Sequence, residues 1–362
     1  MNLKQQQHWV NVETFAHVIA LSVMPKVLNP QIVNLKERNA AVDPIRLLET
    51  FRPPPRFSGV RFSNYQPNPA FPSQQIAKTR LEKFVLEGVA RKSFGFFKKL
   101  EVSPSLYLDG GFGVGKTHLL AATWFESNLE KVFLSFSELV FTIGALGMEK
   151  AVQAFAKYKL ICLDEFELDD VGNTLMVAMF FGRLIPNGTR VVTTSNTLPN
   201  QLGEGRFNAD DFKREIQSIA SRFESLRVDG EDYRHREGLS TPHPMTDTQL
   251  EQQFLAFAGV KAFETFTDLN THLEKLHPIR YVGLLEGIQG VFVTGLTPIE
   301  KQDDALRFVH FVDKLYDREI RFTASGCEIS ELFLESYKHG GYAKKYSRCA
   351  SRLGELLRDS TP

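Results

Sequence analysis

The chain has 362 residues, and its 43 Lys and Arg residues are balanced by 43 Asp and Glu residues. This length predicts two domains, or one large domain with extensions, and the hydrophobic content of 43% is ordinary for a globular protein. The balanced charge argues against a dedicated nucleic-acid-binding protein, which would be basic. The three cysteines have no CxxC spacing, which argues against a disulfide framework or a zinc site.

The N-terminal part of the chain carries no recognisable chemistry over residues 1–50. Its one apolar stretch, Phe15–Leu28, is short and interrupted by polar residues and a proline. The sequence therefore predicts neither a membrane span nor a signal peptide, and we expect a cytoplasmic protein. The density of prolines over Phe51–Pro72 then favours an extended strap. We assign residues 1–73 to an N-terminal extension with this strap.

A helix is predicted from Ser73 onward, with Ile76, Leu81, Phe84, Val85 and Val89 spaced for one buried face. Apolar segments then alternate with helical ones. The predicted strands are 105–110, 131–136, 160–166 and 189–196, and the predicted helices are 117–128, 137–147, 148–158 and 177–183. Continuous apolar strands between helices indicate an α/β fold with a parallel sheet that is covered on both faces. We assign this core to residues 74–237.

A polar segment after Arg236 marks a boundary. Beyond it, strands are predicted at 290–296 and 319–325 with a helix at 303–317 between them, and two helices follow near Ile329–Tyr337 and Tyr342–Leu357. Residues 238–362 are therefore predicted to form a smaller C-terminal α/β region.

One motif in the predicted core matches the pattern G-x-x-x-x-G-K-[ST], with a strand before it and a helix after it. The glycines allow backbone N–H groups to surround phosphates, and the following helix contributes its positive N-terminal end. Lys116 is expected to reach the β- and γ-phosphates of ATP, and Thr117 to ligate Mg²⁺. The predicted nucleotide-binding residues are Gly110, Gly111, Phe112, Gly113, Val114, Gly115, Lys116 and Thr117.

Two acidic residues end the next apolar strand, 47 residues after Thr117. Ligands of open α/β sheets lie at the carboxyl ends of the strands. We therefore expect Asp164 to hold Mg²⁺ and Glu165 to act as the general base for hydrolysis. Asn196 ends the following strand and is predicted to orient the attacking water, with Thr194 as the second choice.

These motifs carry a family resemblance. Together with VDGEDYRHR and the C-terminal segments FVDKLYD, EIRFTASG and SRLGEL, they resemble the ZapE-type cell-division ATPases and their mitochondrial relatives, a branch of the AAA+ P-loop ATPases. The matching segments extend roughly from Pro53 to Leu357. The resemblance implies ATP hydrolysis, a role at the bacterial division ring, and the tubulin-like protein FtsZ as the partner whose polymers are destabilised.

The resemblance also implies a homo-oligomer, because AAA+ sites usually receive an arginine from the neighbouring subunit. The candidates after the last predicted core strand are Arg206, Arg214 and Arg222, of which we favour Arg222 and then Arg206. Arg352 in the last helix is a candidate for a second sensor. We favour the interpretation in which Arg352 pairs with an acid on its own helix.

The main functional alternative is a helicase-loader-like ATPase that acts on DNA, because such loaders share the core motifs. That role would require a basic, salt-sensitive surface. The basic segments near the core, Arg91–Lys99 and Arg234–Arg236, are short, and the net charge is zero. A protein partner is therefore favoured over nucleic acid, and Glu165 argues against a nucleotide switch without hydrolysis.

Overall fold

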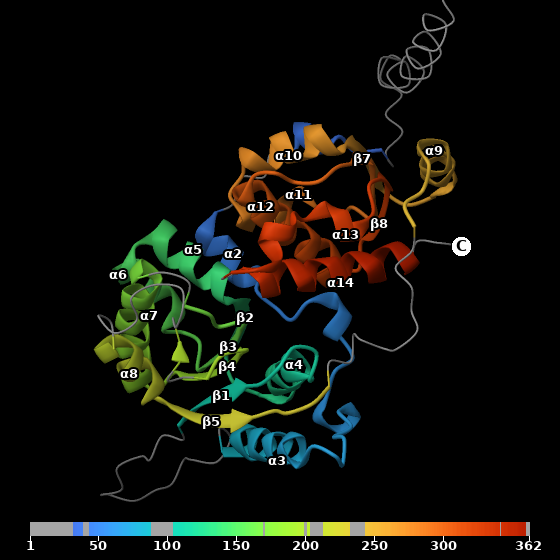
Figure 1. Cartoon of the computed structure of the whole chain (residues 1–362). Coiled ribbons are helices and arrows are strands. Elements are labelled where there is room, and N and C mark those ends of the chain that lie inside the picture. Colours follow the sequence, from blue (N-terminus) through green and yellow to red (C-terminus); the bar gives the residue numbers. More distant parts are fainter. Residues whose placement is uncertain are drawn as a thin grey trace, which may run out of the picture.

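The computed structural model describes residues 32–38, 43–87, 104–168, 171–198, 201–202, 213–231, 243–340 and 342–359. They form two α/β units that lie against each other (Figure 1). The larger unit contains a sheet in the order β2-β3-β4-β1-β5. Its strands are β1 Ser105–Asp109, β2 Lys131–Ser135, β3 Leu160–Asp164, β4 Arg190–Ser195 and β5 Phe223–Arg227. All strand pairs are parallel, so the carboxyl ends of the strands lie at one edge.

Both faces of this sheet are covered, because successive side chains of each strand point in opposite directions. Ile161 and Leu163 enter one core, and Leu160 and Cys162 enter the other. The first core is shared with α2 Pro44–Thr50, α5 Phe136–Leu146, α6 Met148–Phe155, α7 Val171–Leu184 and α8 Lys213–Ala220. The second is shared with α3 Pro72–Glu87 and α4 Lys116–Glu126. The predicted P-loop-type α/β core is confirmed.

The smaller unit contains a parallel three-stranded sheet in the order β6-β7-β8. Its strands are β6 Lys261–Thr265, β7 Gly290–Leu296 and β8 Arg321–Gly326. One core beside it is formed with α10 Phe266–Glu274, α11 Tyr281–Leu284, α12 Gln302–Asp317, α13 Ile329–Leu332 and α14 Ala343–Asp359. The helix α9 Asp247–Ala256 packs on the sheet through Phe254, whose ring lies 5.2 Å from Phe263 and 5.3 Å from Phe292. The predicted C-terminal α/β region is thus confirmed.

The segment before residue 73 contributes to both units. Leu35 is buried in the C-terminal core, whereas Leu47 and Phe62 are buried in the cores beside the large sheet. The short 3₁₀ turns of the described residues include η1 Leu35–Glu37, η2 Pro55–Phe57, η3 Phe62–Asn64, η4 Ile185–Asn187, η7 Pro278–Arg280 and η8 Glu335–Lys338. The boundaries after residues 73 and 237 stay predictions.

Two local predictions are wrong. Ile76 is 63% exposed, because five residues along a helix turn it about 140° away from the buried Leu81. The helix expected over Ile329–Tyr337 is broken between α13 and η8, because Phe333 is extended and forms a bridge with Ile299. Val89 lies outside the described residues. The short strands β5 and β6 were not predicted, because neither contains a continuous apolar run.

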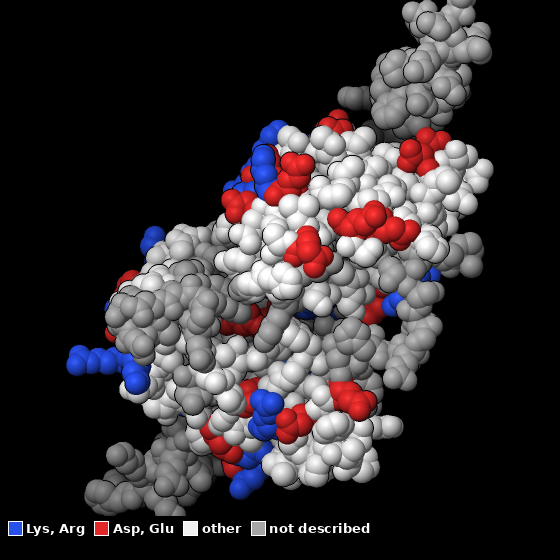
Figure 2. Space-filling model, in the orientation of Figure 1, with Lys and Arg blue, Asp and Glu red and all other residues white. Residues whose placement is uncertain are grey.

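The surface of the described residues carries charges of both signs. Figure 2 shows Lys and Arg side chains in small separate groups among Asp and Glu side chains on the face drawn. The basic segments Arg91–Lys99 and Arg234–Arg236, and the apolar stretch Phe15–Leu28, lie outside the described residues. Among the helices that the structure describes, none is long and apolar enough to cross a membrane.

Candidate functional site

A cavity of about 440 Å³ lies at the carboxyl edge of the large sheet. The motif at the start of α4 forms one wall, and Asp164, Glu165, Thr194 and Asn196 at the ends of β3 and β4 form another. The C-terminal unit and the strap contribute further lining residues: Arg56, Phe57, Tyr316, Arg348, Glu355 and Arg358. The site therefore lies between the two units of the chain.

The glycine motif adopts a backbone that side chains would prevent. Gly110 has φ of +156°, and a Cβ atom there would lie 2.1 Å from the carbonyl oxygen of Val228. Gly115 has φ of +92° in the left-handed region, and a Cβ there would lie 2.8 Å from the ring of Tyr65. The turn places Lys116 Nζ 2.9 Å from the carbonyl oxygen of Gly110 and 3.0 Å from Asn196 Oδ1. This loop is therefore compact and directs its lysine into the cavity.

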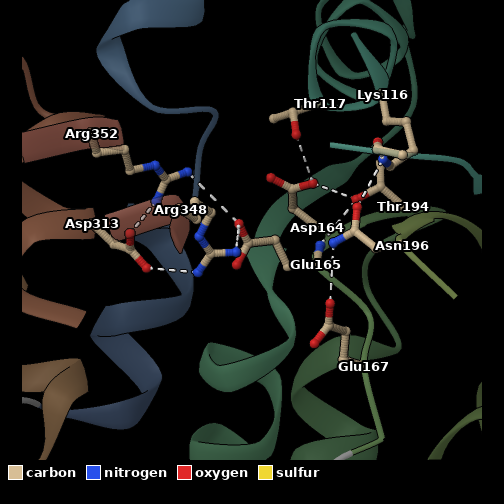
Figure 3. A network of polar contacts seen from close by, with 11 residues as sticks. Lys116, Thr117, Asp164, Glu165, Glu167, Thr194, Asn196, Asp313, Arg348 and Arg352 are labelled. Carbon is tan, nitrogen blue, oxygen red and sulfur yellow. Dashed lines mark hydrogen bonds and ion pairs between the residues drawn. The ribbon is translucent and has the colours of Figure 1, made fainter. Parts of the chain in front are cut away.

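Asp164 accepts hydrogen bonds from two hydroxyl groups (Figure 3). Thr117 Oγ1 lies 3.1 Å from Asp164 Oδ1, and Thr194 Oγ1 donates to the same oxygen. Burial raises the pKa of Asp164 to about 6, with a further contribution from the adjacent Glu165. A nearby cation offsets the cost of ionising a buried carboxylate, so the positions of Thr117 and Asp164 fit a hard ion such as Mg²⁺ between them.

Glu165 has a strained backbone, with φ of 56° in the left-handed region. Two hydrogen bonds to Thr194 hold it: the N–H of Glu165 donates to Thr194 Oγ1 at 3.0 Å, and the N–H of Phe166 donates to the carbonyl oxygen of Thr194 at 2.7 Å. The carboxylate of Glu165 accepts a hydrogen bond from Arg348 Nη1 at 2.8 Å. The side chain of Glu165 therefore reaches a residue of the C-terminal unit.

Asn196 lies in the same cavity, at the end of β4. Its Oδ1 accepts from Lys116, and its Nδ2 donates to Glu167 Oε1 at 3.2 Å (Figure 3). The structure therefore brings together Lys116, Thr117, Asp164, Glu165 and Asn196.

Arg222 is not among the residues that line this cavity. It follows α8 and lies beside α7, where a Cβ on Gly182 would be 3.7 Å from Arg222 Nη2. Among the described residues its buried Nε has no hydrogen-bond partner. Arg214 is exposed on α8, and Arg206 lies outside the described residues.

The expectation that Arg352 pairs with an acid on its own helix is wrong. Arg352 donates to Asp313 on α12, because α14 packs along that helix. Its Nη2 also lies 3.8 Å from Glu165 Oε1. Sequence reasoning missed Arg348, which lies one turn before Arg352 on α14 and lines the cavity. The available signal was the spacing of two arginines by four residues on an amphipathic helix.

Comparison with known proteins agrees with these features. The sequence model of the AFG1-like ATPase family matches residues 41–258 and 238–360. The cell division protein ZapE of Escherichia coli strain K12 is 25% identical over 295 residues, which cover 69% of this chain and 77% of that protein. An uncharacterized protein of Schizosaccharomyces pombe is 23% identical over 261 residues, which cover 56% of this chain and 57% of that protein.

Among solved structures, that of DnaI is 20% identical and has a TM-score of 0.41, covering 49% of this chain and 93% of that chain. The predicted resemblance to ZapE-type ATPases is confirmed by the family match and by the sequence similarity to the cell division protein ZapE. Since the two family matches together extend from residue 41 to residue 360, this chain belongs to the AFG1-like ATPase family.

Proposed function

We propose that this protein binds ATP with Mg²⁺ in the cavity at the start of α4 and hydrolyses the β–γ phosphoanhydride bond. One observation carries the proposal. A phosphate-binding loop, its lysine and the polar ends of two neighbouring strands meet in the same cavity. Separately these features occur in many proteins, but their convergence supplies the parts that nucleotide hydrolysis requires.

The binding roles follow from the chemistry of each group. The backbone N–H groups of Gly110–Thr117 suit phosphate oxygens, and Lys116 adds a positive charge near the β- and γ-phosphates. Thr117 Oγ1 and Asp164 Oδ1, which lie 3.1 Å apart, are the oxygen ligands that would hold Mg²⁺. When bound, Mg²⁺ supplies positive charge that offsets the charge of the phosphates.

The catalytic roles belong to Glu165 and Asn196. Glu165 is assigned as the general base that accepts a proton from the attacking water. The water oxygen bonds to the γ-phosphorus as the bond from that phosphorus to the bridging oxygen breaks, and ADP leaves with phosphate as the other product. Asn196, which already contacts Lys116, is assigned to orient this water.

Arg222 is assigned as an arginine finger that acts on the site of a neighbouring subunit. Its position beside α7, outside the cavity lining, is compatible with a role in trans rather than in its own site. This assignment requires a homo-oligomer in the ATP-bound state. The finger would neutralise charge that develops in the transition state, which is an effect on rate more than on binding.

The proposed task is remodelling of a cytoplasmic cell-division polymer, with FtsZ as the partner. The partner class comes from the resemblance to the cell division protein ZapE. A site that differs with and without the γ-phosphate can bias the affinity of a partner, which links hydrolysis to release. On the face drawn in Figure 2, charges of both signs lie interspersed on the described residues, which suits a protein partner better than a DNA backbone.

Co-sedimentation with FtsZ polymers tests this proposal directly. The wild-type protein should sediment with polymers in an ATP-dependent way and reduce the amount of polymer over time. Glu165→Gln should lengthen the association, and Lys116→Ala should abolish its ATP dependence. Binding to FtsZ that is equally absent with and without ATP, together with tight, salt-sensitive binding to single-stranded DNA, would establish the helicase-loader alternative instead.

A further inference from the structure

A cluster of four charged side chains crosses the interface between the two units of the chain. Arg348 donates from Nη1 to Glu165 Oε1 at 2.8 Å and from Nη2 to Asp313 Oδ2 at 2.9 Å. Arg352 donates to the other oxygen of Asp313 and lies 3.8 Å from Glu165 Oε1. Two positive and two negative groups are therefore matched, as Figure 3 shows.

The cluster is anchored on the C-terminal side. The side chains of Arg348 and Asp313 are only 8% and 11% exposed, whereas that of Glu165 is 37% exposed. Asp313 receives both arginines and holds them against α12, so the guanidinium of Arg348 is fixed before it reaches Glu165. The attraction of these two basic groups keeps the pKa of Asp313 well below its usual range, so Asp313 stays ionised.

The position of the Glu165 carboxylate depends on Arg348, which Asp313 holds in place. Two hydrogen bonds to Thr194 fix the backbone around Glu165, but these bonds leave the rotation of its side chain open. The charged hydrogen bond from Arg348 defines where the carboxylate lies. A general base must lie within hydrogen-bond reach of the water that it deprotonates, so the direction of this carboxylate controls the chemical step.

A second ion pair, which is partly buried, joins the same parts of the two units. Lys314, the residue after Asp313, lies 2.9 Å from Glu138 Oε1 at the start of α5. Glu138 Oε2 accepts from the N–H of Ser135 at 2.8 Å, and Ser135 lies opposite Asp164 in the sheet. Neighbouring residues of α12 are thus connected to the ends of both β2 and β3. A shift of α12 would therefore move the groups that contact Glu165.

We infer that Arg348, held by Asp313, is a positioning residue that directs the carboxylate of Glu165, and that the C-terminal unit thereby sets the rate of ATP hydrolysis. The inference deepens the proposed function and rests on it. It gives a role to the two arginines of α14, Arg348 and Arg352, which both lie between Asp313 and Glu165. A partner that binds the C-terminal unit could therefore change the rate of hydrolysis by moving Arg348.

The test is steady-state and single-turnover ATPase kinetics of the full chain, with ATP affinity measured separately by equilibrium dialysis. Arg348→Ala should lower kcat by about 10- to 100-fold, because a misplacement of about 1 Å at a reacting centre can cost about 100-fold. ATP affinity should stay at the wild-type level. Asp313→Asn should act in the same direction through the lost anchor. Arg348→Lys should recover part of kcat, because it keeps the charge but loses the two-pronged geometry.

Arg307→Ala is the matched control, because Arg307 also pairs with an acid on α12 but only through a contact to Asp304 within that helix. Its kcat should equal that of the wild type. Unchanged or increased kcat in Arg348→Ala would overturn the inference, as would loss of ATP affinity at constant kcat. Melting temperatures identify a variant that fails to fold, in which case Arg348→Lys decides. If the wild-type protein itself shows no turnover, the proposed function fails rather than this inference alone.

Discussion

Replacing Thr194 by valine removes one hydroxyl group that serves both acidic residues of the site. Thr194 Oγ1 donates to Asp164 Oδ1 and accepts from the N–H of Glu165 at 3.0 Å. Valine has nearly the same shape, so the substitution tests the two hydrogen bonds with little change in packing. We expect it to destabilise the fold and to slow hydrolysis together.

The magnitude follows from the two bonds. A hydrogen bond to a charged group contributes about 1.5–3 kcal/mol, and one between neutral groups contributes about 0.5–1.5 kcal/mol. Asp164 keeps its bond from Thr117, so it is not left without a donor. The sum predicts a loss of about 2–4.5 kcal/mol in the free energy of unfolding. Hydrolysis falls because the left-handed backbone at Glu165, which costs about 1–3 kcal/mol, loses one of the contacts that hold it.

Urea denaturation measures the stability, and a phosphate-release assay measures the turnover. Thr193→Val is the control, because Thr193 lies on the same strand and is also buried, and its hydroxyl donates to the carbonyl oxygen of Leu163 at 2.9 Å. This control should lose only about 0.5–1.5 kcal/mol and keep its turnover. Equal stability and equal turnover in the two variants would refute the argument that Thr194 holds the acidic pair.

The remaining predictions concern the nucleotide. Lys116→Ala should abolish ATP binding or turnover, since the phosphates lose the lysine charge of the loop; near-normal activity would contradict the site. Glu165→Gln should bind ATP with Mg²⁺ normally in a filter assay yet stall hydrolysis, and a failure to bind would make Glu165 structural. Arg222→Ala should slow hydrolysis at unchanged ATP affinity. Mixing it with Lys116→Ala should restore some activity. If the mixture restores activity to Arg206→Ala and not to Arg222→Ala, Arg206 is the arginine finger. The pKa of Asp164 is raised to about 6, so its carboxylate binds a proton as the pH falls through this value and the folded state gains stability there. Because Mg²⁺ competes with this proton, calorimetry should show Mg²⁺-dependent ATP binding weakening from pH 7 to pH 5. Asp164→Asn should show a weaker dependence, because only the protonation of the ATP phosphates then remains.

Local sequence signals predicted the candidate nucleotide site and most of the large sheet. The glycine motif can be recognised in the sequence because few residues other than glycine adopt its backbone conformation. A side chain at Gly110 would collide with Val228, and one at Gly115 would collide with Tyr65. The strand β3 is readable because a strand buried on both faces is continuously apolar. A functional role for the acidic residues at the end of β3 could be predicted because ligands lie at the carboxyl ends of the strands in such sheets. These features depend on neighbours in the sequence.

The tertiary structure alone decided what completes the site. Arg348 and Glu165 are separated by 183 positions, and no local pattern selects one acid for a given arginine when the chain has 43 acidic residues. Arg352 shows the same limit, since its partner is Asp313 on α12 rather than an acid on its own helix. The packing of α14 against α12, on the side of the C-terminal unit that faces the larger unit, makes this choice (Figure 1). Buried charges need partners within a few ångströms, and only the packing of distant helices determines which charges come that close.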